Sequence, residues 1–170
     1  FCGCGGLSLG VKEAIRSFSM KSKVLASVDN DPDTLDVYKY NITPETAFVQ
    51  NVNSMVDFQI KGRDDEAEFG YHPEIIEPSL SSLTGKVDIL LASPPCQGHS
   101  NLNNHTRRDD PRNLLYLAVV AIAIAIKAKT VIIENVPDII KDKKSFVKTA
   151  KVLFRKNGYG CDDSILKADE

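Results

Sequence analysis

The feature that most constrains the fold of this chain is an alternation of short apolar runs with longer segments of helical periodicity. Runs typical of buried strands lie at 23–28, 46–49, 87–92 and 131–133, and helical spacing of apolar residues covers 7–18, 32–41, 113–128 and 146–154. A further strand is predicted to begin at 164–166, and 53–84 is predicted to be an irregular insertion with one short helix. This alternation predicts an α/β fold, a mostly parallel sheet with helices on both faces.

Composition excludes several classes of protein. With 21 basic and 23 acidic residues the formal net charge is −2, so the chain is not one that bulk positive charge holds on DNA, and any nucleic-acid contact must be local. The four cysteines are too few and too irregularly spaced for a disulfide framework, and Cys2 and Cys4 lack a second pair for a zinc site, which favours a reducing compartment and no metal. The longest apolar run, 114–126, falls short of the roughly 20 residues that cross a bilayer, which favours a buried helix.

A glycine-rich turn opens the first predicted helix. Glycines at residues 3, 5 and 6 would let the backbone approach a nucleotide closely, beside the free N–H groups of a helix N-terminus, although a tight turn without a ligand explains such glycines equally well when they stand alone. Asp29 ends the next predicted strand, about 20 residues downstream, where an acidic side chain meets a ribose diol in nucleotide-binding folds. The two features together predict an adenosine-type cofactor.

Two candidate catalytic side chains follow neighbouring predicted strands. Pro94 and Pro95 restrict the backbone as it leaves the strand at 87–92, so Cys96 is expected at the edge of the sheet where ligands bind. Glu134 comes directly after the strand at 131–133. A lone cysteine is commonly a small buried hydrophobic residue and a lone glutamate commonly caps a helix. The polar loop around Cys96 and the order of the strands favour a nucleophile and an acid that flank one pocket.

Three segments in this order resemble the DNA (cytosine-5)-methyltransferases. The family patterns Phe-x-Gly-x-Gly-Gly, Pro-Cys-Gln and Glu-Asn-Val occur here at 1–6, 95–97 and 134–136, and a weaker Asp-x-Arg feature followed by a leucine occurs at 110–112 and Leu115. The resemblance covers essentially the whole chain. It implies a Rossmann-like fold that binds S-adenosylmethionine and an enzyme that methylates carbon 5 of cytosine in double-stranded DNA. In such an enzyme the thiolate of Cys96 would attack carbon 6 of a flipped-out base while Glu134 contacts ring nitrogen 3.

The resemblance also assigns the remaining site residues. The implied cofactor-binding residues are Phe1, Gly3, Gly5, Gly6, Leu7, Asp29, Asn30, Asn51, Val52 and Pro94. The implied substrate-binding residues are Pro95, Gln97, Ser100, Asn135, Arg107, Arg108 and Arg112. Two positions depart from the family pattern: Asn51 replaces an aspartate, keeping an acceptor oxygen but not the charge, and His99 replaces a phenylalanine.

Residues 1–170 are expected to form part of a catalytic domain that is incomplete at both ends and inactive alone. By resemblance, a first strand should precede Phe1 and a Gln-x-Arg-x-Arg segment should follow Glu170, while the target-recognition domain is absent. The full-length protein is expected to be a monomer in the bacterial cytoplasm, either in a restriction-modification system or as a solitary enzyme, or to lie in the nucleus of a eukaryote. The alternatives are one subunit of a split enzyme, a tRNA cytosine-5 methyltransferase, a non-catalytic cofactor-binding module and, least favoured, a nicotinamide-dependent dehydrogenase, which leaves the Pro-Cys-Gln segment unexplained.

Overall fold

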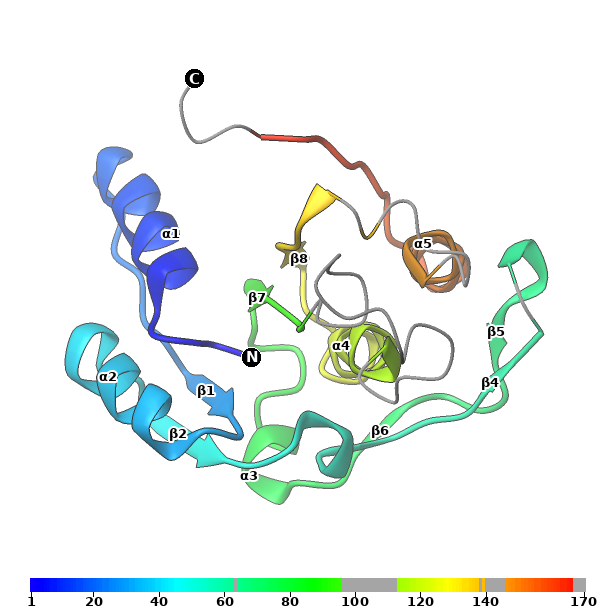
Figure 1. Ribbon diagram of the computed structural model, residues 1–170, viewed down its shortest axis with the longest axis horizontal. Coiled ribbons are helices and arrows are strands. Elements are labelled where there is room, and N and C mark those ends of the chain that lie inside the picture. The colour runs from blue at the N-terminus through cyan, green and yellow to red at the C-terminus, as the bar shows by residue number, and fades with distance from the viewer. Residues whose placement is uncertain (63, 96–112, 138, 140–145, 167–170) are drawn as a thin grey trace, which may run out of the picture.

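The computed structural model describes residues 1–62, 64–95, 113–137, 139 and 146–166, and these form a mixed α/β structure (Figure 1). Its helices are α1 (Gly6–Ser17), α2 (Pro32–Ile42), α3 (Pro78–Ser81), α4 (Asn113–Ala125) and α5 (Phe146–Lys156), with short 3-10 turns η1 (Val52–Ser54) and η2 (Asp64–Glu66). Its longer strands are β1 (Ala26–Asp29), β2 (Thr46–Val49), β7 (Ile89–Ala92) and β8 (Thr130–Ile133). Its two-residue strands are β3 (Val56–Asp57), β4 (Ile60–Lys61), β5 (Glu68–Phe69) and β6 (Glu74–Ile75).

The longer strands pair in parallel, as the alternation predicts, but as two separate pairs rather than as one sheet. β1 pairs with β2 from Ala26↔Thr46 onward, and β7 pairs with β8 from Ile89↔Thr130 onward. The backbone of the first two residues lies between the pairs: the Cys2 N–H donates to the Val28 carbonyl at 3.1 Å, and the Phe1 carbonyl accepts from the Ser93 N–H at 3.3 Å. These bonds hold the carboxyl ends of β1 and β7 beside each other, although the two strands do not pair directly.

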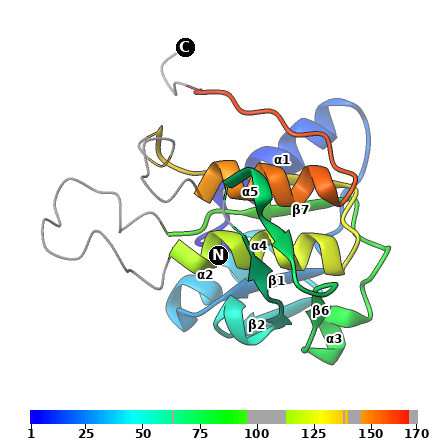
Figure 2. The same cartoon turned by 90° about the vertical axis from the view of Figure 1, so that its right-hand side faces the viewer.

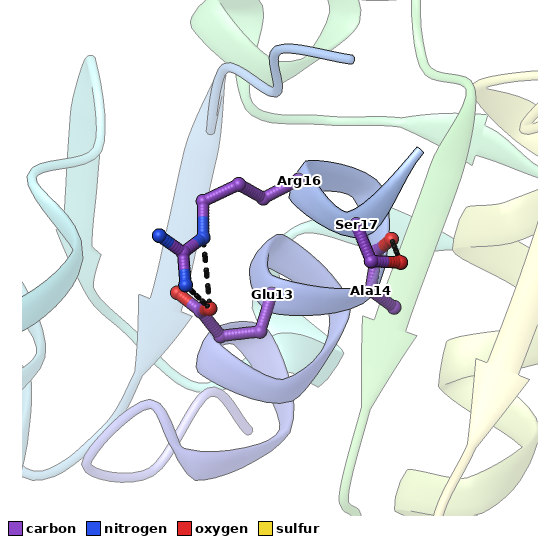
Figure 3. Close-up of polar contacts among 4 residues, drawn as sticks. All are labelled: Glu13, Ala14, Arg16 and Ser17. Atoms are coloured by element: carbon purple, nitrogen blue, oxygen red, sulfur yellow. Dashed lines mark hydrogen bonds and ion pairs between the residues drawn. The ribbon is translucent and has the colours of Figure 1, made fainter. Parts of the chain in front are cut away.

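Helices cover both faces of the strands, which confirms that part of the prediction. Figure 1 shows α1 and α2 on one side of the strands and α4 and α5 on the other. α2 begins where the sequence predicts, because the Asp31 side chain accepts from the Thr34 N–H at 3.0 Å and Pro32 occupies the first turn. On the exposed side of α1, Glu13 and Arg16 form an ion pair (Figure 3).

The segment 53–84 is more regular than predicted. Besides the short helix α3, it forms an antiparallel arm in which β3 pairs with β6 and β4 pairs with β5. The rings of Phe58 and Phe69 meet edge to face inside the arm, with their centroids 6.3 Å apart. The arm passes across α4, and its tip at η2 reaches α5 (Figure 2), where Lys148 forms an ion pair with Asp65 at 2.8 Å. Strands of two residues are too short to display the alternation from which a strand is predicted.

α4 forms the centre of the core, which explains why its sequence is apolar on every side. All its residues from Leu117 to Ala125 are buried. Leu90 and Val131 of the strands, Val56 and Phe58 of the arm, and Leu153 of α5 belong to the clusters that surround it. The prediction of a buried helix is therefore confirmed. Among the described residues, no helix combines the length and apolar character needed to span a membrane.

The strand predicted at 164–166 is wrong. These residues adopt no regular structure and pair with no described strand, and the side chains of Ile165 and Leu166 are exposed. A short apolar run indicates a strand only where a neighbouring strand completes its hydrogen bonds.

Candidate active site

A cavity of about 540 Å³ opens at the carboxyl ends of β1, β2 and β7. Its volume lies within the range of about 300–1,000 Å³ that is usual for small-molecule sites. Ten of the residues assigned from the sequence line it: Phe1, Gly3, Gly5, Gly6, Leu7, Asp29, Asn30, Asn51, Val52 and Pro95. The fold therefore brings together the glycine-rich turn, the acidic end of β1 and the proline-rich segment after β7, which are far apart in sequence.

The glycine-rich turn forms one wall of this cavity. Gly3 and Gly5 have φ angles of +53° and +96°, a backbone conformation that side-chain-bearing residues rarely adopt. A Cβ on Gly5 would lie 2.9 Å from Cγ1 of Ile42 and 3.2 Å from the ring of Tyr38, so this glycine is also needed for α1 to pack against α2. Within the described part of the chain, no side chain caps the N-terminus of α1. Its first turn, beginning at Gly6, therefore offers N–H groups to a ligand in the cavity.

Asp29 joins the end of β1 to this turn. One carboxylate oxygen accepts from the Gly3 N–H at 2.9 Å and the other accepts from the Asp31 N–H at 3.2 Å. The residue is 9% exposed and lines the cavity. A carboxylate offers about four lone-pair positions, so Asp29 retains acceptor capacity beyond these two bonds for a ribose diol.

The Cys2 thiol also lines the cavity and lies 4.0 Å from the Asp29 carboxylate. Burial raises the pKa of Cys2 to about 11, and the negative charge of Asp29 acts in the same direction. The thiol is therefore protonated at neutral pH and is a poor nucleophile.

The chain after β2 forms the opposite wall. The Gln50 N–H donates to the Asp29 carbonyl at 2.9 Å, which extends the pairing of β1 and β2 by one bond and brings residues 50–52 to the cavity. The Asn51 side-chain oxygen accepts from the Asn53 N–H at 3.0 Å and caps η1. That oxygen has a second lone pair for a ligand, while Val52 is buried below it.

Glu134 and Asn135 follow β8, next to the segment that leaves β7. The Glu134 N–H donates to the Ala92 carbonyl at 2.9 Å, and the Glu134 side chain is exposed beside the cavity rather than lining it. The Asn135 amide donates to the Pro94 carbonyl at 3.0 Å. Pro94, assigned to the cofactor from the sequence, is buried and does not line the cavity.

Six assigned residues lie outside the described residues: Cys96, Gln97, Ser100, Arg107, Arg108 and Arg112. Covalent continuity alone locates the start of that segment, because Cys96 directly follows Pro95, which lines the cavity. Pairing of β7 with β8 brings Glu134 to the end of β7, where its N–H bonds to the Ala92 carbonyl.

Five residues that line the cavity were not assigned from the sequence: Cys2, Cys4, Gln50, Ser93 and Leu115. Gln50 and Ser93 directly follow strands, so the rule that led to Asp29 could have identified both. Leu115 reaches the cavity from α4, and no local pattern indicates that.

Comparisons with known proteins agree with this geometry. A family model described as C-5 cytosine-specific DNA methylase matches residues 1–170. The Bacillus subtilis (strain 168) protein named type II methyltransferase M1.BsuMI is 38% identical over 170 residues, which are 100% of this chain and 38% of that protein. The Xanthomonas oryzae type II methyltransferase M.XorII is 30% identical, over 94% of this chain and 32% of its own length. DNA (cytosine-5)-methyltransferase PliMCI of Paracentrotus lividus is 25% identical over 100% of this chain and 10% of its own length.

The chain thus spans less than half the length of these relatives. The family model matches every residue of the chain, and the glycine-rich turn and Asp29 line one cavity with Pro95. Glu134 directly follows β8, the strand that pairs with β7. On this basis the chain belongs to the family of C-5 cytosine-specific DNA methylases.

Proposed function

We propose that residues 1–170 carry the cofactor site and the reaction centre of an enzyme that transfers a methyl group from S-adenosylmethionine to carbon 5 of cytosine in DNA. The observation that carries the proposal is a nucleotide-sized cavity that is lined by the glycine-rich turn, by Asp29 and by Pro95, the residue before Cys96, with Glu134 at the end of the strand that pairs with β7. In this proposal the chain adopts the Rossmann-like fold of methyltransferases. Recognition of the DNA sequence belongs to polypeptide outside residues 1–170.

The cavity fits the cofactor in chemistry as well as in volume. Asp29 has spare acceptor positions for the two ribose hydroxyls, and the uncapped first turn of α1 offers N–H groups to the carboxylate of the methionine part. Phe1 and Val52 supply apolar surface for the adenine, and Asn30 and Asn51 supply polar groups at its edge. When bound, S-adenosylmethionine supplies an electrophilic methyl group on a positively charged sulfur.

The reaction needs help from the protein because carbon 5 of an aromatic cytosine is a weak nucleophile. Attack of the Cys96 thiolate on carbon 6 breaks the aromaticity and sends electron density toward ring nitrogen 3, where Glu134 as a carboxylic acid donates a hydrogen bond. Carbon 5 of the resulting enamine takes the methyl group. A base then removes the proton from carbon 5, and the bond between Cys96 and carbon 6 breaks. The cytosine must leave the base stack for these atoms to meet.

Covalent trapping tests this proposal directly. The full-length product of the native gene, as wild type and as Cys96→Ser, would be incubated with S-adenosylmethionine and a duplex that contains 5-fluorocytosine. Fluorine at carbon 5 blocks the final elimination, so the wild type is expected to form a protein–DNA adduct that survives denaturant, and Cys96→Ser is expected to form none. Binding of S-adenosylmethionine to both proteins, measured by calorimetry, serves as the control for folding.

Two other outcomes would overturn parts of the proposal. An adduct on tRNA but not on DNA would replace the substrate and keep the chemistry. Binding of the cofactor without any adduct would favour a non-catalytic module.

A further inference from the structure

The Asn135 side chain forms two hydrogen bonds, one of which connects the ends of β7 and β8. Its side-chain amide donates to the Pro94 carbonyl at 3.0 Å, and its side-chain oxygen accepts from the Val136 N–H at 2.9 Å. The residue is half-buried and directly follows Glu134. The contact with Pro94 joins two loops that are 41 residues apart in sequence.

The backbone beyond β7 needs such a contact because it cannot continue the strand pairing. The last bond between the two strands runs from the Glu134 N–H to the Ala92 carbonyl. Pro94 and Pro95 have no N–H to donate, so the ladder that holds β7 against β8 cannot extend through them. A side chain from the β8 loop makes the connection in place of the backbone.

We infer that Asn135 is a positioning residue, which holds the Pro94 carbonyl and so fixes the point from which Cys96 departs relative to Glu134. The inference rests on the proposed function. Cys96 lies two residues beyond Pro94, and successive Cα atoms are about 3.8 Å apart, so its Cα lies within about 7.6 Å of the Pro94 Cα. The fixed φ angles of the two prolines limit how far the chain can swing over that distance.

Asparagine suits this position because one short side chain both donates and accepts. Aspartate has nearly the same shape and can still accept from the Val136 N–H, but its carboxylate has no proton to give to the Pro94 carbonyl. Asn135→Asp therefore removes the connection and leaves two oxygens opposed across it.

The test compares Asn135→Asp with Asn157→Asp in the full-length native protein. Asn157 is a matched control, because its amide also donates to a backbone carbonyl, that of Leu153 at 2.8 Å, at the far end of α5. At saturating DNA and S-adenosylmethionine, Asn135→Asp is expected to form the 5-fluorocytosine adduct about 10- to 100-fold more slowly than the wild type, the scale of a displacement near 1 Å at a reacting group. The affinity for S-adenosylmethionine and the melting temperature are expected to match those of Asn157→Asp, whose rate stays at the wild-type value.

A wild-type rate of adduct formation in Asn135→Asp would overturn the positioning role. Equal loss of rate, cofactor affinity and melting temperature would also overturn it, in favour of a general structural role. If the aspartate variant does not fold, Asn135→Ala replaces it, because alanine removes the donor without opposing two oxygens. The same loss of rate, with unchanged cofactor affinity and melting temperature, is then expected of Asn135→Ala. Failure of the wild type itself to form an adduct would instead refute the proposed function, so the two failures are distinguishable.

Discussion

Replacing Asp29 by asparagine is expected to lower the stability of the fold, although the two side chains have nearly the same shape. Both carboxylate oxygens accept backbone N–H groups, from Gly3 at 2.9 Å and from Asp31 at 3.2 Å. Whichever way the amide of asparagine is turned, its NH₂ group faces one of these two donors. A fully buried donor that loses its partner costs about 1–3 kcal/mol, and these two donors are only partly buried, so the expected loss in the free energy of unfolding is at the lower end, about 1 kcal/mol.

The same substitution is expected to weaken cofactor binding. The NH₂ group cannot accept a hydrogen bond from a ribose hydroxyl, and a hydrogen bond to a charged group contributes about 1.5–3 kcal/mol. Since about 1.4 kcal/mol corresponds to a tenfold change in an equilibrium constant, the loss of one such bond is expected to raise the Kd for S-adenosylmethionine about 10- to 100-fold.

Urea unfolding and titration calorimetry measure the two effects of Asp29→Asn separately. Asp31→Asn makes the same chemical change two residues away, where the side chain caps α2 by accepting from the Thr34 N–H. Because asparagine caps helices about as well as aspartate, this control is expected to stay within about 0.5 kcal/mol of the wild type. If Asp29→Asn also unfolds and binds S-adenosylmethionine like the wild type, the role assigned to the carboxylate is refuted.

Three further predictions follow from the packing and from the thiol in the cavity. Gly5→Ala is expected to lower the free energy of unfolding in urea by about 2–5 kcal/mol, the sum of about 1–2 kcal/mol for the left-handed backbone and about 1–3 kcal/mol for crowding against α2. Gly10 has open space around it within α1, so Gly10→Ala is expected to be neutral or stabilising in the same assay, and equal effects of the two substitutions would contradict this explanation. The Tyr159 hydroxyl donates a 2.5 Å hydrogen bond to the carbonyl of Ala128, which lies just after α4, so Tyr159→Phe is expected to lower the free energy of unfolding by about 1–3 kcal/mol. An unchanged urea midpoint would show that water replaces this bond. Alkylation of Cys2 by iodoacetamide, followed by mass spectrometry, is expected to be slow at pH 7 and to accelerate about tenfold per pH unit toward pH 11, because the raised pKa keeps the thiol protonated below pH 11. A rate that stops rising by pH 9 would refute the raised pKa.

Much of the secondary structure follows from the sequence alone because its signals are local. Apolar spacing identified α1, α4 and α5, and the Asp31-Pro32 pair set the start of α2. The arm formed by 53–84 could not be anticipated, because its strands are two residues long and are stabilised by packing on α4 and α5. The prediction of a strand at 164–166 is wrong for the opposite reason: the apolar residues are present, but no described strand lies beside them to pair with.

The chemistry of the candidate site was determined by the sequence, and its geometry by the tertiary structure. Residue types and their order after strands predict Cys96 and Glu134 as nucleophile and acid, because parallel strands bring their carboxyl ends to one edge. Only the folded chain could show that the Asp29 carboxylate accepts two backbone N–H groups, or that the Asn135 amide donates to the Pro94 carbonyl. Hydrogen bonds between loops that are 26 and 41 residues apart depend on where the whole fold places each backbone group, and no local pattern of residues encodes that.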